Sequence, residues 1–490
     1  MKRYAAVLVT LALAAAPAVA EPTETSTPYK GGELVSFPDE TGTIRHADLV
    51  LPPEAFTASN GADAISPVIF MNRCKGGCNM RSAGRDDART NDSTIPNQPD
   101  GTIVPIPEFP WGDDVWNQFM TCIKEVYSPY NVTVTDVDPG MSTVHHEVIV
   151  AGLAADVGLN QGILGIAPVA GDCLPKNNNI SYAFAGAYPP SEVLELCATA
   201  AQESAHSWGL DHEFDCTDPM TYLSNCGEKF FRNKAVACGE FAARECRCGG
   251  AAQNSHAQIL SVFGPGQSTV PAPTVSVISP KNNDVVTSGF SVFVDASGQR
   301  GVAKIEVLLN GYKWASLAPA DIHASGPFTI ATPGNVPDGI IDIEARAYDD
   351  LGLYNSTTLT VTKGAPCTTA DTCAIGQACD AGKCHWNPPT KELGEACTFL
   401  QECVSGVCQD IGGGSMVCTQ PCFTGIDGQC PTSFECVSAG GASGFCLEGG
   451  GGGDGKGCCS AGESSATELA TQLGIIGLVG AVVFRRRRRA

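Results

Sequence analysis

Hydrophobic and polar positions follow different patterns in different parts of the chain, and each pattern predicts a different kind of domain. Over residues 67–264, short runs of strand composition stand beside stretches with the 3.6-residue spacing of a buried helix face. Helical spacing covers residues 114–127 and 191–207, and the predicted strands lie in SPVIFM, YNVTVTDV and HHEVIVAGL. We therefore expect a mixed α/β (α+β) domain over residues 67–264.

Short alternating runs replace the helical spacing after a linker rich in Gly, Pro and Ser over residues 265–274. Six runs between residues 275 and 364 have strand composition: TVSVISP, GFSVFVDASG, AKIEVLLNG, GPFTIATP, GIIDIEARAYDDLG and STTLTVT. Their spacing predicts an all-β sandwich of six or seven strands. The segment resembles bacterial immunoglobulin-like modules, which implies a spacer or a binding module.

Cysteines dominate the next region, residues 365–448, which we expect to consist of small disulfide-rich repeats. Three successive groups of four cysteines have similar gaps between their members, and the groups begin at Cys367, Cys397 and Cys422. Units this short cannot bury a hydrophobic core, so covalent links must hold them. Zinc ribbons are the alternative, but they favour Cys-x-x-Cys spacing, which these units lack.

Both ends of the chain carry targeting patterns. Residues 1–20 have the basic start, apolar run and small-residue cleavage site of a signal peptide. Residues 449–490 contain a glycine-rich spacer, two adjacent cysteines, a short apolar run and five arginines. This order resembles the C-terminal sorting tails of myxobacterial surface proteins, which implies attachment to the cell envelope. Residues 21–66 have two interpretations: they are a pro-segment, or they form the first strands of the domain that follows.

The charge of the chain limits its partners. The formal net charge is −22 at neutral pH. Such acidity argues against nucleic acid as a partner, because phosphate backbones repel a negatively charged surface. It names no substrate by itself.

The predicted helix over residues 191–207 holds the residues with the most telling chemistry. Ser191 is expected to cap its start and Gly209 to end it. Gln202 and His206 are one helical turn apart, so their side chains reach towards one point. Gly209 then lets the chain bend, which brings His212 towards the same point.

Such a cluster, with an open position, is what a catalytic zinc ion needs. Glu203 is placed to act as general base on a zinc-bound water. The segment QESAHSWGLDH, followed by DPMTY, resembles the metzincin metalloproteases. By that resemblance His206 and His212 are zinc ligands, Glu203 is the catalytic base and Met220 lies beneath the metal. Tyr222 then corresponds to the tyrosine that steadies the oxyanion.

Gln202 is the departure from the metzincin pattern, because the family has its first histidine ligand there. An amide oxygen is a poorer ligand for zinc than imidazole, so weaker metal binding is expected. Water or Asp215 are other ways to complete the site. His145 and His146 are further candidates, although adjacent residues in a strand point to opposite faces.

Cysteines close to the motif have two interpretations. Cys74, in the segment NRCKGGC, is either a thiolate that blocks zinc in a latent precursor or half of a disulfide with Cys78 or a more distant partner. The even number of cysteines in this region favours a disulfide. Cys216 and Cys226 bracket the predicted methionine turn, where a disulfide would hold the loop under the metal.

Three functions are consistent with these patterns. The first is an exported, surface-associated zinc metalloendopeptidase that hydrolyses peptide bonds in a protein or peptide substrate. The second is a catalytically inactive protein of the same fold that acts in adhesion or ligand binding. The third is a ligand-binding function of the cysteine-rich units, which the upstream domain presents.

Overall fold

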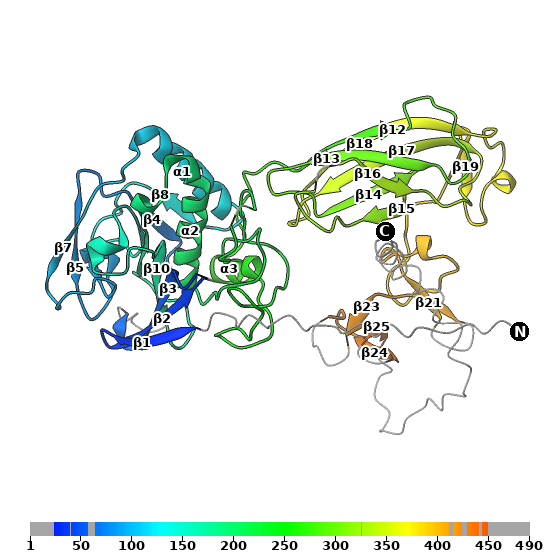
Figure 1. The fold of residues 1–490 in the computed structure, drawn as a ribbon. Helices are drawn as coiled ribbons and strands as arrows, with labels where there is room; N and C mark the ends of the chain where they lie inside the picture. The colour runs from blue at the N-terminus through cyan, green and yellow to red at the C-terminus, as the bar shows by residue number, and fades with distance from the viewer. Residues whose placement is uncertain are drawn as a thin grey trace, which may run out of the picture. The chain divides into compact units, whose positions relative to one another are not determined.

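The computed structural model describes residues 24–448 except 40, 57–63, 225, 325, 411–414, 424–428 and 441–442. The chain divides into two compact units, Met1–Trp386 and Asn387–Ala490. The protein is rich in β-structure, with few helices in the described part (Figure 1). The predicted signal peptide and C-terminal tail lie outside the described residues. None of the described helices has the length and apolar character needed to cross a bilayer.

An eight-stranded mixed sheet organises the first part of the chain. Its strand order is β1-β2-β3-β10-β11-β9-β4-β8. Five of its strands come from residues 67–264: β4 (Val68–Asn72), β8 (Thr133–Thr135), β9 (His146–Val150), β10 (Gly165–Ala170) and β11 (Ile180–Ala183). The strands predicted from SPVIFM, YNVTVTDV and HHEVIVAGL are therefore confirmed. β10 was not predicted, since Pro168 lies inside it and a proline argues against a strand.

The N-terminal segment extends this sheet. It contributes β1 (Thr25–Tyr29), β2 (Gly32–Pro38) and β3 (Ile44–Leu51). β3 pairs in parallel with β10, with His46 opposite Gly165 and Asp48 opposite Ala167. Residues 24–51 thus supply strands to the same sheet as the downstream domain (Figure 1).

Three α-helices accompany the sheet: α1 (Gly112–Tyr127), α2 (Val193–His206) and α3 (Ser255–Phe263). Their apolar side chains and those of β4 and β9 form one core, to which α1 contributes Trp116 and Phe119. Side chains such as Leu49 and Tyr182 form a second core with the small sheet β6-β5-β7. That sheet consists of β5 (Cys78–Ser82), β6 (Asp92–Ser93) and β7 (Ile103–Ile106).

Both predicted helices are confirmed, with one correction at the start of α2. Ser191 does not cap this helix, because it lies inside a 3-10 turn, Pro190–Glu192, that leads directly into it. Glu192 occupies the N-cap position and makes no side-chain capping bond. The two prolines at 189 and 190 start the turn earlier than the helical spacing indicates.

The predicted sandwich is present as two facing sheets. One contains β12 (Thr274–Ser279), β13 (Ser291–Ser297) and β16 (Phe328–Ala331); the other contains β14 (Lys304–Leu309), β15 (Tyr312–Leu317), β17 (Gly339–Tyr348) and β18 (Tyr354–Lys363). All six predicted runs are strands. The seventh, β15, follows a two-residue turn at Asn310 and Gly311, both with positive φ. This Asn-Gly pair is a hairpin signal that was available in the sequence.

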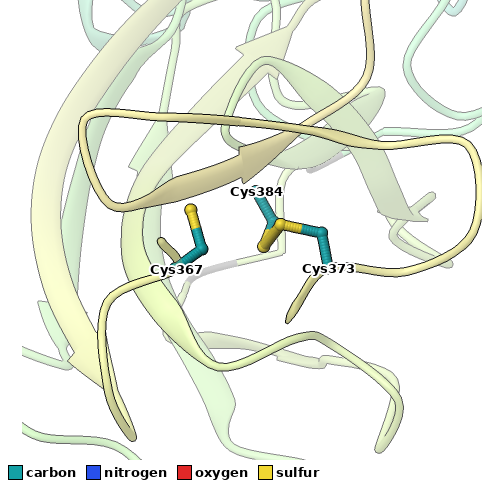
Figure 2. Close-up of side chains that lie close together, drawn as sticks. All are labelled: Cys367, Cys373 and Cys384. Carbon is teal, nitrogen blue, oxygen red and sulfur yellow. A yellow bond between two sulfur atoms is a disulfide. The ribbon is translucent and has the colours of Figure 1, made fainter. Parts of the chain in front are cut away.

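The three cysteine-rich units share one disulfide connectivity, first to third and second to fourth cysteine. The six bonds are Cys367–Cys379, Cys373–Cys384, Cys397–Cys408, Cys403–Cys418, Cys422–Cys436 and Cys430–Cys446. Figure 2 shows three sulfur atoms of the first unit close together, with Cys373 and Cys384 joined. Because disulfides occupy these sulfur atoms, they are not thiolate ligands, and the disulfide prediction is confirmed over the zinc ribbon.

The strands of these units are short. They are β19 (Ala378–Asp380), β20 (Lys383–His385), β21 (Cys408–Asp410), β22 (Met416–Cys418), β23 (Pro421–Phe423), β24 (Phe434–Gly440) and β25 (Ser443–Glu448). The first cysteine-rich unit belongs to the same compact unit as the sandwich, where β20 packs on β17. In the second cysteine-rich unit, which begins at Cys397, the described residues have a core of three buried half-cystines. Cys408 and Met416 pack against this core.

Candidate functional site

The end of α2 and the turn after it carry the predicted metal-binding residues. α2 packs on β9, β10 and β11, which buries Gln202, Glu203 and His206. Gly209 follows with a φ of +84°. A Cβ at this position would lie 2.7 Å from the Cys173 carbonyl oxygen, so glycine is required there on two counts. The predicted bend after the helix is therefore confirmed.

Each of the two histidines is held by a hydrogen bond to its Nδ1. The Nδ1 of His206 lies 2.8 Å from the carbonyl oxygen of Leu210, the residue that follows the bend at Gly209. The Nδ1 of His212 lies 2.8 Å from Oε1 of Glu240. Both partners accept hydrogen bonds, so both Nδ1 atoms donate and a neutral ring keeps its lone pair on Nε2. The Nε2 atoms have no hydrogen-bond partner among the described residues.

A carboxylate from the N-terminal segment faces these two nitrogens. Oδ1 of Asp48, on β3, lies 3.6 Å from the Nε2 of His206 and 4.0 Å from the Nε2 of His212. Its Oδ2 accepts a hydrogen bond of 2.7 Å from Arg247. Burial alone would raise the pKa of Asp48, but His206 and Arg247 lower it below its usual range. Asp48, His206 and His212 form a buried group with metal-ligand spacing.

Glu203 lies beside this group without belonging to it. Its Oε1 is 3.8 Å from Nδ1 of His46, the other polar residue of β3 on this side of the sheet. Its Oε2 has no hydrogen-bond partner in the described part of the chain. Burial, and then the negative charge of Asp48, raise the pKa of Glu203 well above its usual value. A Cβ on Gly165 would lie 2.5 Å from Oε1, so this glycine leaves room for the carboxylate.

A cavity of about 420 Å³ lies on one side of the cluster. Gln202 and Tyr222 line it, together with His46 and side chains of α2 and the N-terminal segment. The Tyr222 ring stacks on His46 at 4.2 Å between centroids and tilts against His212 at 4.4 Å. The Tyr222 hydroxyl and the Gln202 Nε2 are buried, and neither has a hydrogen-bond partner among the described residues.

The loops after α2 are fixed by buried contacts and disulfides. Met220 is fully buried, and its carbonyl oxygen accepts a 2.6 Å hydrogen bond from the amide of Glu213. A disulfide was expected at the cysteines that bracket this turn, and the structure joins Cys216 to Cys226. Cys238–Cys246 closes the loop that carries Glu240, and Cys173–Cys248 anchors the residue that follows Arg247. These cross-links keep the partners of the histidines in place.

Four of the alternative residues lie elsewhere. Asp215 hydrogen-bonds to Thr217 and pairs with Lys234. His145 bonds the Thr143 carbonyl, and His146 packs edge-on against Trp208. Cys74 is joined to Cys78 in a disulfide, so the prediction that it blocks zinc as a thiolate is wrong and the alternative bridge is confirmed. None of these four belongs to the group around His206 in the described structure.

Two residues of the cluster were not predicted from the sequence. Asp48 stands in the otherwise apolar strand segment ADLVL, where a buried polar residue at a strand position is a detectable signal. Glu240 lies in a loop whose sequence has no helical or strand periodicity that would place its side chain. Its role depends entirely on the disulfide-closed loop that brings it to His212.

The cluster has the donor set of a zinc site. Around a tetrahedral zinc ion, ligand atoms at about 2.0–2.1 Å from the metal are about 3.3 Å from one another. The separations of 3.6 and 4.0 Å between Asp48 and the histidines are close to this value. They are too long for hydrogen bonds, and the facing atoms are all acceptors. A cation between them would satisfy the two orphaned nitrogens and the carboxylate together.

Comparison with known proteins identifies one module. Residues 273–345 match the family described as a bacterial Ig domain, which confirms the predicted immunoglobulin-like module. No curated protein matches the chain.

Among solved structures, the fibronectin(III)-like modules of Clostridium thermocellum CbhA are 20% identical over 19% of this chain and 97% of theirs, with a TM-score of 0.16. The endo-beta-1,4-mannanase from Thermotoga petrophila is 16% identical, over 22% of this chain and 23% of its own, with a TM-score of 0.15. CopC from Methylosinus trichosporium OB3b is 19% identical, over 19% and 94%, with a TM-score of 0.15. Likenesses at these TM-scores carry no functional argument.

Proposed function

We propose that the protein is an exported, surface-associated zinc metalloendopeptidase of metzincin type. The observation that supports this most directly is the pair of Nε2 atoms of His206 and His212, which face the Asp48 carboxylate and have no hydrogen-bond partner in the described part of the chain. Their Nδ1 atoms are fixed by a carbonyl and a carboxylate, the usual outer partners of zinc-binding histidines. Glu203 lies three residues before His206 on the same helix.

The residues have separable roles in this proposal. His206 and His212 hold the zinc ion, which when bound supplies Lewis acidity towards water and a peptide carbonyl. Glu203 takes the proton from the attacking water, and its Oε2, which has no hydrogen-bond partner among the described residues, is available for this. The unpartnered Tyr222 hydroxyl lies at the cavity wall and can donate a hydrogen bond to a developing oxyanion. The cavity beside Gln202 accommodates a substrate side chain.

The N-terminal strand bears on how substrate reaches this cluster. β3 lies on the edge of β10, and Glu203, His206 and His212 are each 1% exposed. The cavity that Gln202 and Tyr222 line lies beside the cluster while β3 stays paired with β10, so we place the approach of a peptide on that side.

Casein cleavage by the full-length protein, with zinc and with its Glu203→Ala variant as control, tests the proposal. Each protein is assayed with and without added zinc. Zinc-dependent cleavage that falls at least about 100-fold in Glu203→Ala supports a general-base role. If the parent does not cleave casein with any supplied metal, the endopeptidase proposal is wrong.

A second candidate is a catalytically inactive protein of the same type that acts in adhesion or ligand binding. Gln202, at the position of the family's first histidine, and the near-complete burial of the cluster favour it. The substitution Gln202→His separates the two. Zinc binding and proteolysis that appear only in this variant identify the parent as inactive, whereas activity that is already present in the parent and unchanged in the variant shows that the site needs no histidine at position 202.

The cellular part of the proposal rests on the terminal sequences. The signal-like residues 1–20 imply export, and the tail of residues 449–490 implies attachment to the envelope. The immunoglobulin-like module and the cysteine-rich units then act as spacers or substrate-gripping modules outside the cell. Fractionation of cells that express the full chain, with and without the tail, tests this placement.

A further inference from the structure

We infer that Asp48 is the third protein ligand of the metal, in place of the histidine that the motif lacks at Gln202. This inference rests on the metal site of the proposed function and names a ligand that lies outside the motif. The N-terminal strand β3 supplies it, although many elements of the chain separate β3 from α2, which carries His206, and from the loop that carries His212.

Strand geometry explains why Asp48 points at the histidines. Neighbouring residues in a strand face opposite sides of the sheet, so Ala47 and Leu49 face one side and His46 and Asp48 the other. Ala47 and Leu49 are part of the core on the far side from α2. The register with β10 places Asp48 opposite Ala167, two residues beyond Gly165, which makes room for Glu203. His46 and Asp48 therefore meet Glu203 and the histidines, respectively.

The two oxygens of Asp48 have different surroundings. Oδ2 accepts a hydrogen bond from Arg247, which fixes the carboxylate plane. Oδ1 is left facing the two Nε2 atoms. The two histidines are arranged in the same way. In each of them Nδ1 is held by a hydrogen bond, and Nε2 faces Asp48. All three side chains are thus oriented by outer contacts towards a single point.

A simple ion pair between Asp48 and a protonated histidine explains the geometry less well. Such a pair would bring Nε2 and Oδ1 to within about 3 Å, the range of a charge-assisted hydrogen bond. The two distances are 3.6 and 4.0 Å. Two histidines at unequal but similar separations from one oxygen are arranged as co-ligands rather than as one bonded pair and one bystander.

Metal-binding measurements on the full-length protein test this inference without reliance on catalysis. Zinc affinity is measured by competition with a chelator for the parent, Asp48→Asn and Asp39→Asn. Asp39 is a matched control, since it lies in the turn between β2 and β3 and hydrogen-bonds to Thr41 and Arg45. Loss of an outer partner costs about 10- to 100-fold in affinity, so loss of a ligand should cost more than about 100-fold.

Cobalt substitution gives a second, positive readout. In Asp48→Cys, a thiolate at the metal adds an intense near-ultraviolet absorption band to the cobalt spectrum. Asp39→Cys should add none. If loss of the Asp48 carboxylate leaves Arg247 unpaired and prevents folding, the double variant Asp48→Cys/Arg247→Met removes both charges of the pair and restores a testable protein.

The outcomes separate the inference from the proposed function. A thiolate band with Asp48→Cys, together with a loss above about 100-fold in Asp48→Asn, supports Asp48 as ligand. A parent that binds metal, while Asp48→Asn binds it within about 100-fold and Asp48→Cys gives no band, overturns the inference and leaves the proposed function standing. A parent that binds no metal overturns both.

Discussion

The sandwich and the histidine-bearing domain fill their interiors with different chemistry. In β17 of the sandwich every second residue is buried, and the core that it joins consists of apolar side chains such as Ile305 and Ile343. The interior beside α2 instead holds Asp48, Glu203 and two histidines, each of them 1% exposed. Several of their polar atoms lack a hydrogen-bond partner among the described residues.

The contrast indicates where the protein's chemistry lies. Burial of polar atoms without partners costs about 1–3 kcal/mol for each atom, which an apolar core avoids. The sandwich follows the rules of a stable scaffold. Among the described residues, the histidine-bearing domain gathers several such atoms around α2 and β3, where we propose that a metal ion binds.

A cavity in the sandwich core should have the largest effect on stability. Ile343→Ala should lower the free energy of unfolding of the sandwich by about 3 kcal/mol, because it empties a fully buried position. Denaturant unfolding measures the loss, and hydrogen exchange should show unchanged protection in α2. Thr358→Ala, at an exposed position of β18, is the control and should change stability by less than about 0.5 kcal/mol. Equal loss of protection in both regions would contradict independent cores.

Zinc should stabilise the histidine-bearing domain and leave the sandwich unchanged. At a free concentration 100 times its Kd, a ligand that binds only the folded state adds about 2.7 kcal/mol. Hydrogen exchange with and without zinc should show slower exchange around α2 and no change in β17. His206→Ala should abolish the difference, while His385→Ala, in a cysteine-rich unit, should preserve it. Stabilisation of the sandwich by zinc would break the comparison.

Loss of the Glu240 carboxylate, which holds His212, should weaken zinc binding less than loss of a ligand but more than a change elsewhere in the same loop. Glu240→Gln should weaken zinc binding by about 10- to 100-fold, since the amide is a poorer acceptor for the Nδ1 proton than the carboxylate. Chelator competition measures this change. Glu245→Gln, at an exposed position in the same disulfide-closed loop, should leave the affinity unchanged. Equal effects of the two substitutions would remove Glu240 from the site.

The smallest effect concerns a buried carboxyl on β9, remote from the histidines. Burial raises the pKa of Glu147 to about 8, so the folded chain keeps a proton that the unfolded chain releases above about pH 4. Its contribution to stability is therefore fullest at low pH and is lost as pH rises towards 8.

Glu147→Gln should remove that loss, because glutamine does not ionise. The free energy of unfolding of the variant should exceed that of the parent by on the order of 1 kcal/mol at pH 8. Glutamine also keeps an oxygen that accepts the hydrogen bond from the Asn72 side chain. The measurement is the unfolding midpoint of parent and variant at pH 5 and pH 8. The difference between the two proteins should be larger at pH 8. A difference that is independent of pH would show that Glu147 is ionised in both states.

Local patterns in the sequence predicted the elements that depend on neighbouring residues. Helical spacing predicted α2, and alternation predicted six strands of the sandwich. Cysteine spacing predicted three repeats, although only the structure gave their shared connectivity. β10 escaped prediction because Pro168 interrupts its pattern; Pro168 lies beyond the two residues that pair with β11, so its missing amide hydrogen costs no bond there.

The sequence by itself determined that Glu203 and His206 share the end of one helix, because a helix converts spacing directly into position, and that a glycine bend lies between them and His212. The tertiary structure decided which other groups meet them. Asp48 arrives through strand pairing between β3 and β10, and Glu240 through a loop closed by a disulfide. Both contacts join segments far apart in the chain, and no local periodicity records such a contact, since it depends on how whole elements pack.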